Sequence, residues 1–170
     1  MTGPFDTGPF DDVLAANARY ADDFPLAGFD GVAHAGVAVV TCMDSRIDPL
    51  GLLGLQPGDA KILRNPGGRV TEQTLSALVL AVHLLGVDRV LVIPHTKCAM
   101  ASADEAELRD QVGAASGLDA SGETFGAVAD QGATLRADVE RVRAHPLVPA
   151  SVDVGGFVYD VDTGRLQQLV

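Results

Sequence analysis

The sequence predicts an α/β fold: a mainly parallel sheet of four strands with an antiparallel edge strand, and helices on both faces. Strand-like and helix-like segments alternate along the chain, which is typical of a parallel sheet. The first and third strand-like segments are apolar without polar alternation, as expected for strands covered on both faces. The last two strand-like segments flank an Asp-Thr-Gly turn at 162–164, which predicts an antiparallel pair.

The first quarter of the chain predicts a helix and then a buried strand. Residues 10–24 place apolar side chains at near-helical spacing, which predicts an amphipathic helix that ends at Pro25. Residues 37–42 are a short run of mostly β-branched side chains that ends at Cys42. This run predicts the first strand, buried on both faces.

The middle of the chain predicts two further strands separated by a helix. Residues 60–64 follow a Gln-Pro-Gly-Asp turn and predict the second strand. Residues 72–85 are almost entirely apolar and are followed by Gly86, which predicts a helix. Because so apolar a helix must be covered, we expect it in a core or a subunit interface. Residues 88–94 predict the third and most hydrophobic strand, which runs directly into His95.

The last part of the chain predicts two helices and the closing strand pair. A Ser-x-x-Glu capping box at 102–105 predicts the start of one helix. Residues 113–124 are rich in Gly and Ser and predict a surface loop, and residues 124–144 predict the next helix. Residues 156–161 and 165–170 predict the two antiparallel strands.

Composition predicts one globular domain that binds a small ligand. The chain has 170 residues, of which 47% are hydrophobic and 21% charged, and this suits a single domain. We expect residues 1–35 to form an N-terminal arm with its helix and residues 36–170 to form the core. A net charge of −11 provides no basic stripe for nucleic acid and repels anionic membranes, so we expect neither as a partner. The sequence shows no signal-peptide pattern, and we expect a cytoplasmic protein.

Three potential metal ligands follow two of the predicted strands. Cys42 ends the first strand, and His95 and Cys98 come just after the third. If these strands are neighbours, their carboxyl ends meet at one edge of the sheet and the three side chains converge there. Zinc prefers thiolate and imidazole ligands, and three protein ligands leave one position for water or substrate. The sequence therefore predicts an open, catalytic zinc site.

Other interpretations of the two cysteines fit the sequence less well. A disulfide between Cys42 and Cys98 is unusual in a reducing compartment. A phosphatase-like loop needs more than the three residues that separate Cys42 from the next arginine. A purely structural zinc normally has a fourth Cys or His ligand. The remaining histidines are poor candidates for it, because they lie in the apolar helix or in loops: His34, His83 and His145.

Asp44 and Arg46 form the second informative pair. As an exposed ion pair they would add little to stability. Two residues from a metal ligand, however, a carboxylate can accept a hydrogen bond from metal-bound hydroxide, and an arginine can hold that carboxylate through two hydrogen bonds. We therefore expect Asp44 and Arg46 to be catalytic residues.

Three motifs make the sequence similar to the β-class carbonic anhydrases, in particular their short microbial branch. They are Cys-Met-Asp-Ser-Arg at 42–46, Arg-Asn-Pro-Gly-Gly at 64–68 and His-Thr-Lys-Cys at 95–98. The resemblance covers most of the chain. It implies a zinc enzyme that interconverts carbon dioxide and bicarbonate, with Cys42, His95 and Cys98 as zinc ligands. It also implies that Asp44 pairs with Arg46 and, in some members, binds zinc in place of water.

The resemblance further implies a homodimer or higher homo-oligomer in which the N-terminal helix packs on a partner subunit. The expected mechanism is attack of zinc-bound hydroxide on carbon dioxide in a small apolar pocket. The candidate substrate-binding residues are Met43, Pro66, Gly67 and Val70. The alternatives are hydrolysis of carbon disulfide or carbonyl sulfide at the same site, and a catalytically silent zinc-binding regulator.

Three positions beside the expected metal depart from the family's common pattern. Ala99 replaces a glycine, and alanine resists a positive φ that glycine tolerates. Pro66 replaces an alanine. Lys97 stands where short-branch members often have aspartate, so a positive charge replaces a negative one near the metal.

Overall fold

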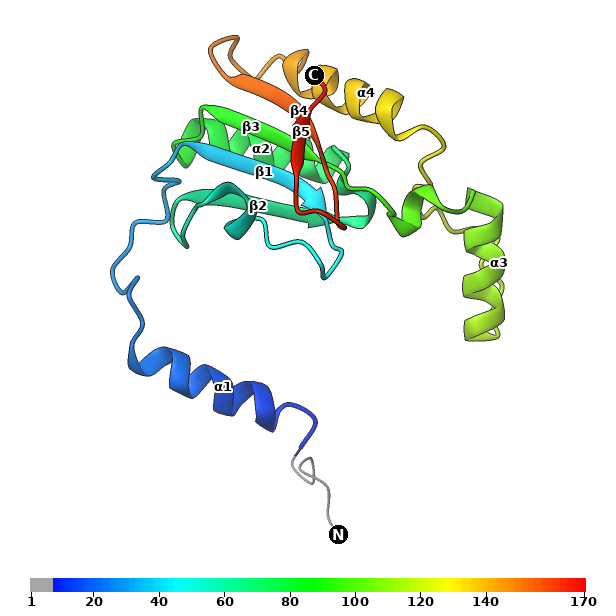
Figure 1. Ribbon diagram of the computed structural model, residues 1–170, viewed down its shortest axis with the longest axis horizontal. Helices are drawn as coiled ribbons and strands as arrows, with labels where there is room; N and C mark the ends of the chain where they lie inside the picture. The colour runs from blue at the N-terminus through cyan, green and yellow to red at the C-terminus, as the bar shows by residue number, and fades with distance from the viewer. Residues whose placement is uncertain (1–7) are drawn as a thin grey trace. The chain divides into compact units, whose positions relative to one another are not determined.

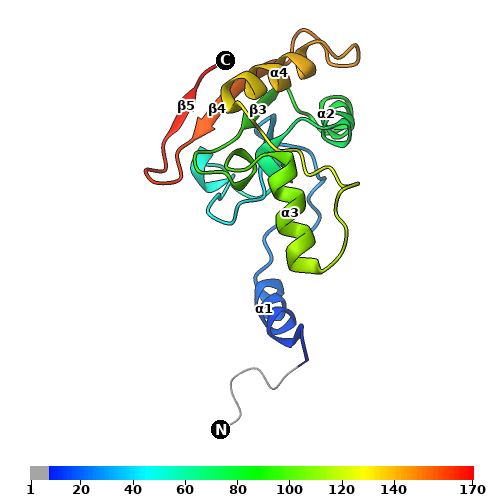
Figure 2. The same ribbon diagram turned by 90° about the vertical axis from the view of Figure 1, so that its right-hand side faces the viewer.

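The computed structural model describes residues 8–170, which fall into two units, one ending at Asp30 and one comprising Gly31–Val170. The larger unit is built on one sheet with the strand order β2-β1-β3-β4-β5 (Figure 1). β1 to β4 run parallel, and β5 pairs antiparallel with β4 at the edge (Figure 2). The predicted mainly parallel sheet is therefore confirmed. The strands are β1 (Val37–Cys42), β2 (Ala60–Asn65), β3 (Arg89–Ile93), β4 (Asp153–Tyr159) and β5 (Leu166–Gln168).

β1 is the central strand of the parallel part and lies between β2 and β3. All six of its residues are buried, as the unbroken apolar run predicts. Its register with β3 pairs Val37 with Arg89 and Thr41 with Ile93, so both strands end at the same edge of the sheet. The Thr41 hydroxyl donates a hydrogen bond of 2.7 Å to the Ile93 carbonyl and joins the two strand ends.

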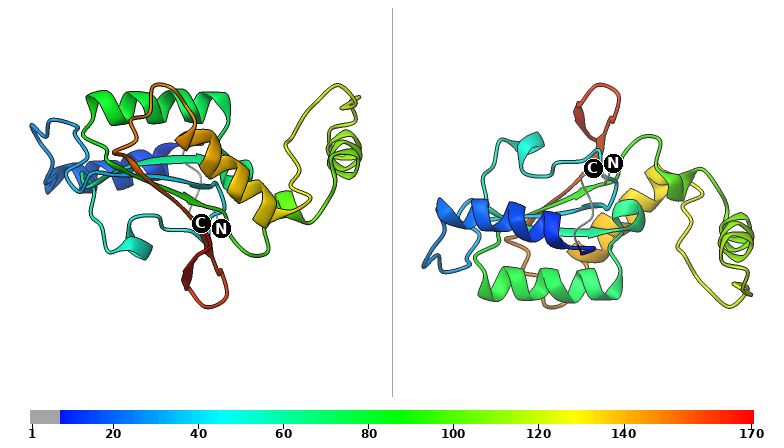
Figure 3. Two further views of the ribbon diagram at one scale, coloured as in Figure 1. Left: turned by 90° about the horizontal axis from the view of Figure 1, so that it is seen from above. Right: turned by 90° about the horizontal axis from the view of Figure 1, so that it is seen from below.

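Helices α2 (Glu72–Leu84) and α4 (Gln131–Arg143) share one face of the sheet and form the main core with β1, β3 and β4. On the opposite face, Val37, Val39 and Ile93 pack against η1 (Gly51–Leu53) and its flanks, and Figure 3 shows α2 and η1 on opposite sides. The prediction of helices on both faces is therefore confirmed, with two α-helices on one face and the 3₁₀ helix η1 of the Gly31–Val170 unit on the other. The strand order explains this: right-handed crossovers from β2 to β3 and from β3 to β4 run in the same direction and so use the same face.

α1 (Asp11–Asp22) forms within the expected 10–24 segment, and none of its residues is buried. Phe10, Val13 and Leu14 are all more than half exposed. α2 buries one face through Thr74, Leu75, Leu78 and Ala81, while Leu80 and Leu84 are exposed. The apolar 72–85 segment therefore contributes side chains to the core from one face of α2 only. Among residues 8–170, every helix is too short or too polar to cross a membrane.

α3 (Glu105–Ser116) begins with a different capping box from the predicted one. The Asp104 carboxylate accepts from the Glu107 backbone N–H at 2.8 Å, and the Glu107 carboxylate accepts from the Asp104 N–H at 2.9 Å. The Ser-x-x-Glu pair at 102–105 is therefore not the cap. The helix continues to a left-handed Gly117, so the predicted 113–124 loop begins four residues later than expected.

The Glu105 carboxylate binds backbone N–H groups that precede α4. The helix is therefore shorter than the predicted 124–144 segment. The carboxylate accepts backbone hydrogen bonds from Phe125, Gly126 and Ala127, which lower the pKa of Glu105. Gly126 has φ +83°, outside the helical region. The predicted helix over 124–144 therefore begins only at α4, after the N-cap Asp130.

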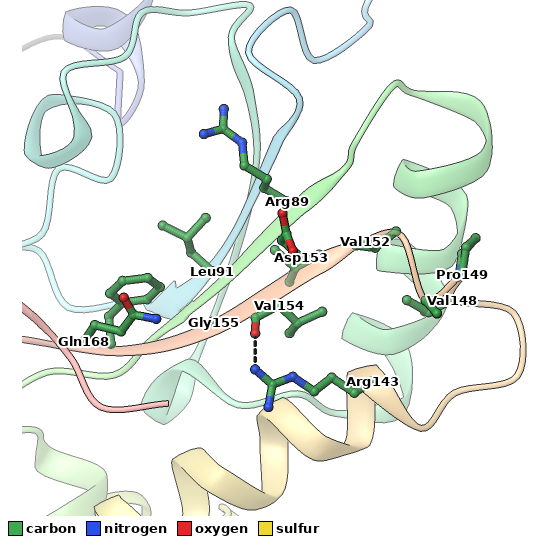
Figure 4. Close-up of a pocket in the computed structure, with 13 residues that line it drawn as sticks. Arg89, Leu91, Arg143, Val148, Pro149, Val152, Asp153, Val154, Gly155 and Gln168 are labelled. Atoms are coloured by element: carbon green, nitrogen blue, oxygen red, sulfur yellow. Dashed lines mark hydrogen bonds between the residues drawn. The ribbon is translucent and has the colours of Figure 1, made fainter.

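β4 begins three residues before the predicted strand and contains Gly155 and Gly156. A Cβ at Gly156 would lie 3.0 Å from Val139 Cγ2, so α4 packs directly on the strand backbone. The first half of β4 borders a surface cavity of about 740 Å³, which Gln168 of β5 also lines. There the Arg143 guanidinium donates to the Val154 carbonyl at 2.5 Å (Figure 4). Gly156 therefore marks a close approach of helix and strand, whereas a Cβ at Gly155 would lie 2.8 Å from the Phe157 ring.

We expect Leu78→Ala to lower the free energy of unfolding by about 2–5 kcal/mol, because Leu78 is fully buried between α2 and the sheet. Urea denaturation followed by circular dichroism measures the change. Ser76→Ala, at an exposed position of the same helix, should change it by less than about 0.5 kcal/mol. Equal effects of the two substitutions would contradict this description of the core.

Candidate metal centre

The structure brings together the three side chains that the sequence singles out as metal ligands. Cys42 is the last residue of β1, and His95 and Cys98 follow β3, its neighbour in the sheet. One ligand atom from each lies within 4.8 Å of the other two. All three residues are buried, with exposed fractions of 4%, 0% and 4%. The expected convergence at one sheet edge is confirmed.

His95 presents one ring nitrogen to the cysteines. Its Nδ1 lies 2.9 Å from the Thr96 carbonyl, a geometry in which Nδ1 carries the proton and donates. Nε2 is buried and has no hydrogen-bond partner among the described residues. Burial lowers the pKa of His95, which favours the neutral imidazole. A buried, unpartnered Nε2 lone pair beside two thiols is the environment that a metal ion satisfies.

The two sulfurs have the separation of zinc ligands rather than of a disulfide. Their Sγ atoms lie 3.9 Å apart, and both cysteines are free thiols. Two ligands each about 2.3 Å from one tetrahedral zinc ion lie about 3.8 Å apart, whereas a disulfide bond is about 2.05 Å long. Burial raises the pKa of the Cys98 thiol, while backbone N–H groups of Met100 and Ala101 partly oppose this. The donor set therefore fits zinc.

Asp44 and Arg46 form the expected two-point contact beside these ligands. Arg46 Nε and Nη2 donate to the two carboxylate oxygens of Asp44 at 2.9 and 2.7 Å, and the Arg46 backbone N–H donates at 2.9 Å. These hydrogen bonds hold the pKa of Asp44 far below its usual range. Asp44 Oδ2 also lies 3.7 Å from His95 Nε2. An ionised carboxylate is thus held at the edge of the metal position.

Two further residues support the ligands and were not recognised in the sequence. Arg64, at the end of β2, donates to the Cys42 carbonyl at 2.9 Å and to the Asp44 carbonyl at 2.6 Å. Gln131, at the start of α4, donates to the His95 carbonyl at 2.8 Å. Arg64 belongs to the Arg-Asn-Pro-Gly-Gly motif at 64–68. No local pattern in the sequence predicts the hydrogen bonds of Arg64 or Gln131 to these backbone carbonyls.

The glycine loop, residues 65–70 after β2, lies against the backbone of Cys42. Gly68 has φ +65°, and a Cβ there would lie only 2.9 Å from the Cys42 nitrogen. Gly67 has φ +77° and is also buried. This close approach is what the two glycines permit.

The four candidate substrate-binding residues are placed differently from one another. Met43 is 64% exposed, while Val70 is 1% exposed and packs in the core beneath α2 and α4. Pro66 is exposed and Gly67 is buried. Met43 therefore has its side chain at the surface, whereas the side chain of Val70 is enclosed in the core.

The departures from the family pattern have specific structural outcomes. Among the described non-glycine residues only Lys97 has a positive φ, of 54°, whereas Ala99 lies in η3 (Ala99–Ala101). The alanine is therefore not strained in the way that its replacement of glycine suggests. The Lys97 ammonium lies 2.6 Å from the Asp162 carboxylate, and its carbonyl accepts from Arg46 at 3.2 Å. Asp162 therefore offsets the positive charge that Lys97 adds near the site.

A mainly parallel α/β sheet with a Cys₂His set at its edge is the arrangement of a metal-binding α/β protein. The carbonic anhydrase family model matches residues 37–120. β-Carbonic anhydrase 1 of Mycobacterium tuberculosis is 32% identical over 164 residues, covering 94% of this chain and 96% of the relative. The crystal structure of carbonic anhydrase from Streptococcus mutans has a TM-score of 0.87 at 36% identity and covers 96% of this chain and 99% of that chain. The chain therefore belongs to the β-carbonic anhydrase family.

A second group of relatives carries a different name. The carbon disulfide hydrolase of Acidithiobacillus thiooxidans is 30% identical over 154 residues, covering 76% of this chain and 74% of the relative. The similarity therefore includes proteins named for two substrates.

We expect purified, reduced protein to contain about one zinc ion per chain and His95→Ala to lose it, because two thiolates alone leave the site incomplete. Elemental analysis after gel filtration measures the zinc content. His83→Ala, which changes an exposed histidine on α2, should leave the zinc in place. Zinc retained by His95→Ala, or lost by both variants, would contradict the ligand assignment.

Proposed function

We propose that this protein reversibly hydrates carbon dioxide to bicarbonate and a proton at a zinc ion held by Cys42, His95 and Cys98. The observation that carries the proposal is the convergence of these three buried side chains in a chain that belongs to the β-carbonic anhydrases. When bound, zinc supplies Lewis-acid activation of a water molecule at the position that the protein leaves open.

The protein's own contribution is to hold the ligands and one carboxylate in place. Arg64 and Gln131 fix the backbone carbonyls of Cys42 and His95. Arg46 engages both oxygens of Asp44, which keeps the carboxylate ionised and oriented as a hydrogen-bond acceptor. Because Asp44 is paired with Arg46 in this way, a zinc ion held by Cys42, His95 and Cys98 would keep one position for water or substrate. Met43, Pro66 and Gly67 stay candidates for contact with substrate.

A homodimer completes the proposal. α1 has no buried residue, and it carries exposed Val13, Leu14 and Tyr20. The η1 face of the sheet has partly exposed apolar side chains, among them Leu91 and Phe157, and no α-helix of Gly31–Val170 covers it. Residues 1–35 would act as an arm that covers apolar surface of a second copy. Because exposed apolar surface of this kind marks interaction sites, association into a dimer or higher oligomer is the expected state.

We also propose a cytoplasmic location. Its support is chemical: Cys42 and Cys98 must stay reduced to bind a metal, and the cytoplasm keeps thiols reduced.

Carbon disulfide is the alternative substrate, because some relatives of this chain are named carbon disulfide hydrolases. Carbon disulfide, like carbon dioxide, is a linear molecule with an electrophilic carbon. Stopped-flow carbon dioxide hydration and sulfide release from carbon disulfide should be measured on one zinc-loaded preparation. We expect carbon dioxide hydration. Turnover of carbon disulfide or carbonyl sulfide alone would favour the alternative, and bound zinc without any turnover would indicate a silent zinc-binding regulator.

Asp44→Ala should lower carbon dioxide hydration by roughly 10²-fold while zinc stays bound, because the variant loses the oriented acceptor but none of the three metal ligands. Stopped-flow rates and zinc content from the same sample measure both effects. Asp110→Asn, at an exposed position on α3, is the matched control and should match the wild type. Unchanged turnover in Asp44→Ala would remove Asp44 from the mechanism.

Hydration activity should rise with pH above about 7. Two thiolates cancel the formal charge of zinc (+2 − 2 = 0), so the water that it activates should be less acidic than at a three-histidine site, where its pKa is about 7. The Lys97 ammonium does little to reverse this, because Asp162 pairs with it. Initial rates across pH 6.5–9.5 test the expectation, and a profile that is flat or highest in acid would contradict it.

A further inference from the structure

Asp138 is a buried acidic residue that the proposed chemistry does not use. It lies on α4 among Leu135, Val139 and Val142, and its side chain is only 5% exposed. Its carboxylate accepts from Arg69 Nε at 2.6 Å, from Arg69 Nη2 at 3.2 Å and from the Val70 backbone N–H at 3.2 Å. Burying a carboxylate costs free energy unless it accepts hydrogen bonds from several donors, as Asp138 does. An apolar side chain at this position of α4 would cost less free energy to bury.

The donors to Asp138 belong to the glycine loop, residues 65–70, between β2 and α2. Asn65 holds the backbone of the same arginine, accepting from the Arg69 N–H and donating to the Arg69 carbonyl, both at 2.7 Å. Asn65 also donates to Thr74 on α2 at 3.1 Å. The main chain of Arg69 is thus held by Asn65 and its side chain by Asp138, so both parts of this residue anchor the loop.

This loop is the element that touches both halves of the metal centre. A Cβ at Gly68 would lie 2.9 Å from the Cys42 nitrogen and 3.0 Å from the Thr41 carbonyl carbon. A Cβ at Gly67 would lie 3.5 Å from Met100, in the η3 turn whose N–H groups face the Cys98 sulfur. Movement of the loop would therefore change the surroundings of both sulfurs.

The space around these groups is nearly filled. A cavity of about 10 Å³ lies among Gly67, Gly68, Cys98, Gln131 and Asp138. That is about the volume needed for one water molecule. The loop therefore has little room to relax while its contact with Asp138 is kept.

We propose that Asp138 is a positioning residue for the metal centre, which acts through Arg69 to hold the glycine loop against Cys42 and the turn after Cys98. The inference rests on the proposed zinc site. Asp138 does not touch the metal position. It sets the separation and orientation of the two sulfurs, so its removal loosens metal binding rather than only lowering stability.

The test compares Asp138→Asn with a paired variant, Asp138→Leu with Arg69→Met, which replaces the whole ion pair by apolar side chains. Such a paired replacement is often neutral for stability. Both variants should bind zinc roughly 10- to 100-fold more weakly in chelator competition, the range seen when groups that orient metal ligands are lost. The visible absorption of the cobalt-substituted protein should change as well. Glu140→Gln, at an exposed position of the same helix, should match the wild type in both measurements.

The outcomes distinguish the proposed function from the proposed role of Asp138. Failure of the wild-type chain to bind zinc would overturn the proposed function. Wild-type zinc binding together with an unchanged zinc affinity and cobalt spectrum in a folded paired variant would overturn the role of Asp138. If neither Asp138 variant folds, Arg69→Lys decides, because it keeps the charge but loses the two-point contact. Weaker zinc binding in Arg69→Lys supports the proposal, and wild-type affinity overturns it.

Discussion

The metal centre depends on one constraint: β1 and β3 are neighbours in a parallel sheet and end at the same edge. The pairing of Thr41 with Ile93 places Cys42 beside the start of the segment that carries His95 and Cys98. A slip of β3 by one residue would turn its side chains to the other face and separate the ligands. Arg64, Gln131 and the glycine loop add their contacts to strand ends that are already aligned.

Features with a local signal could be predicted from the sequence. The unbroken apolar run of β1 predicts a buried strand, and the 72–85 segment predicts a helix before Gly86. Cys42, His95 and Cys98 could be recognised because thiols and an imidazole at strand ends have a chemical meaning before any contact is known. The pairing of Asp44 with Arg46 is local too, since only one residue separates them in sequence.

Features that depend on distant contacts could not be predicted. Asp138 lies 69 residues from Arg69 and has the appearance of an ordinary helix charge in the sequence. Two overlapping capping boxes were possible at the start of α3, and the carboxylate of Glu105 is committed to a backbone segment 20 to 22 residues away. The placement of both α2 and α4 on one face of the sheet follows from the strand order, which residue patterns alone leave undetermined.

The burial of all three ligands links metal exchange to motion of the fold. With exposed fractions of 0–4%, the three side chains show little surface to solvent apart from the position that a bound zinc would leave for water or substrate. Loss of a bound ion would require that several ligands let go at once, which local opening of the sheet edge would allow. The free energy of zinc binding would add to the stability of the closed edge, so the rate of zinc exchange would report on the opening of that edge as well as on the strength of the metal–sulfur bonds.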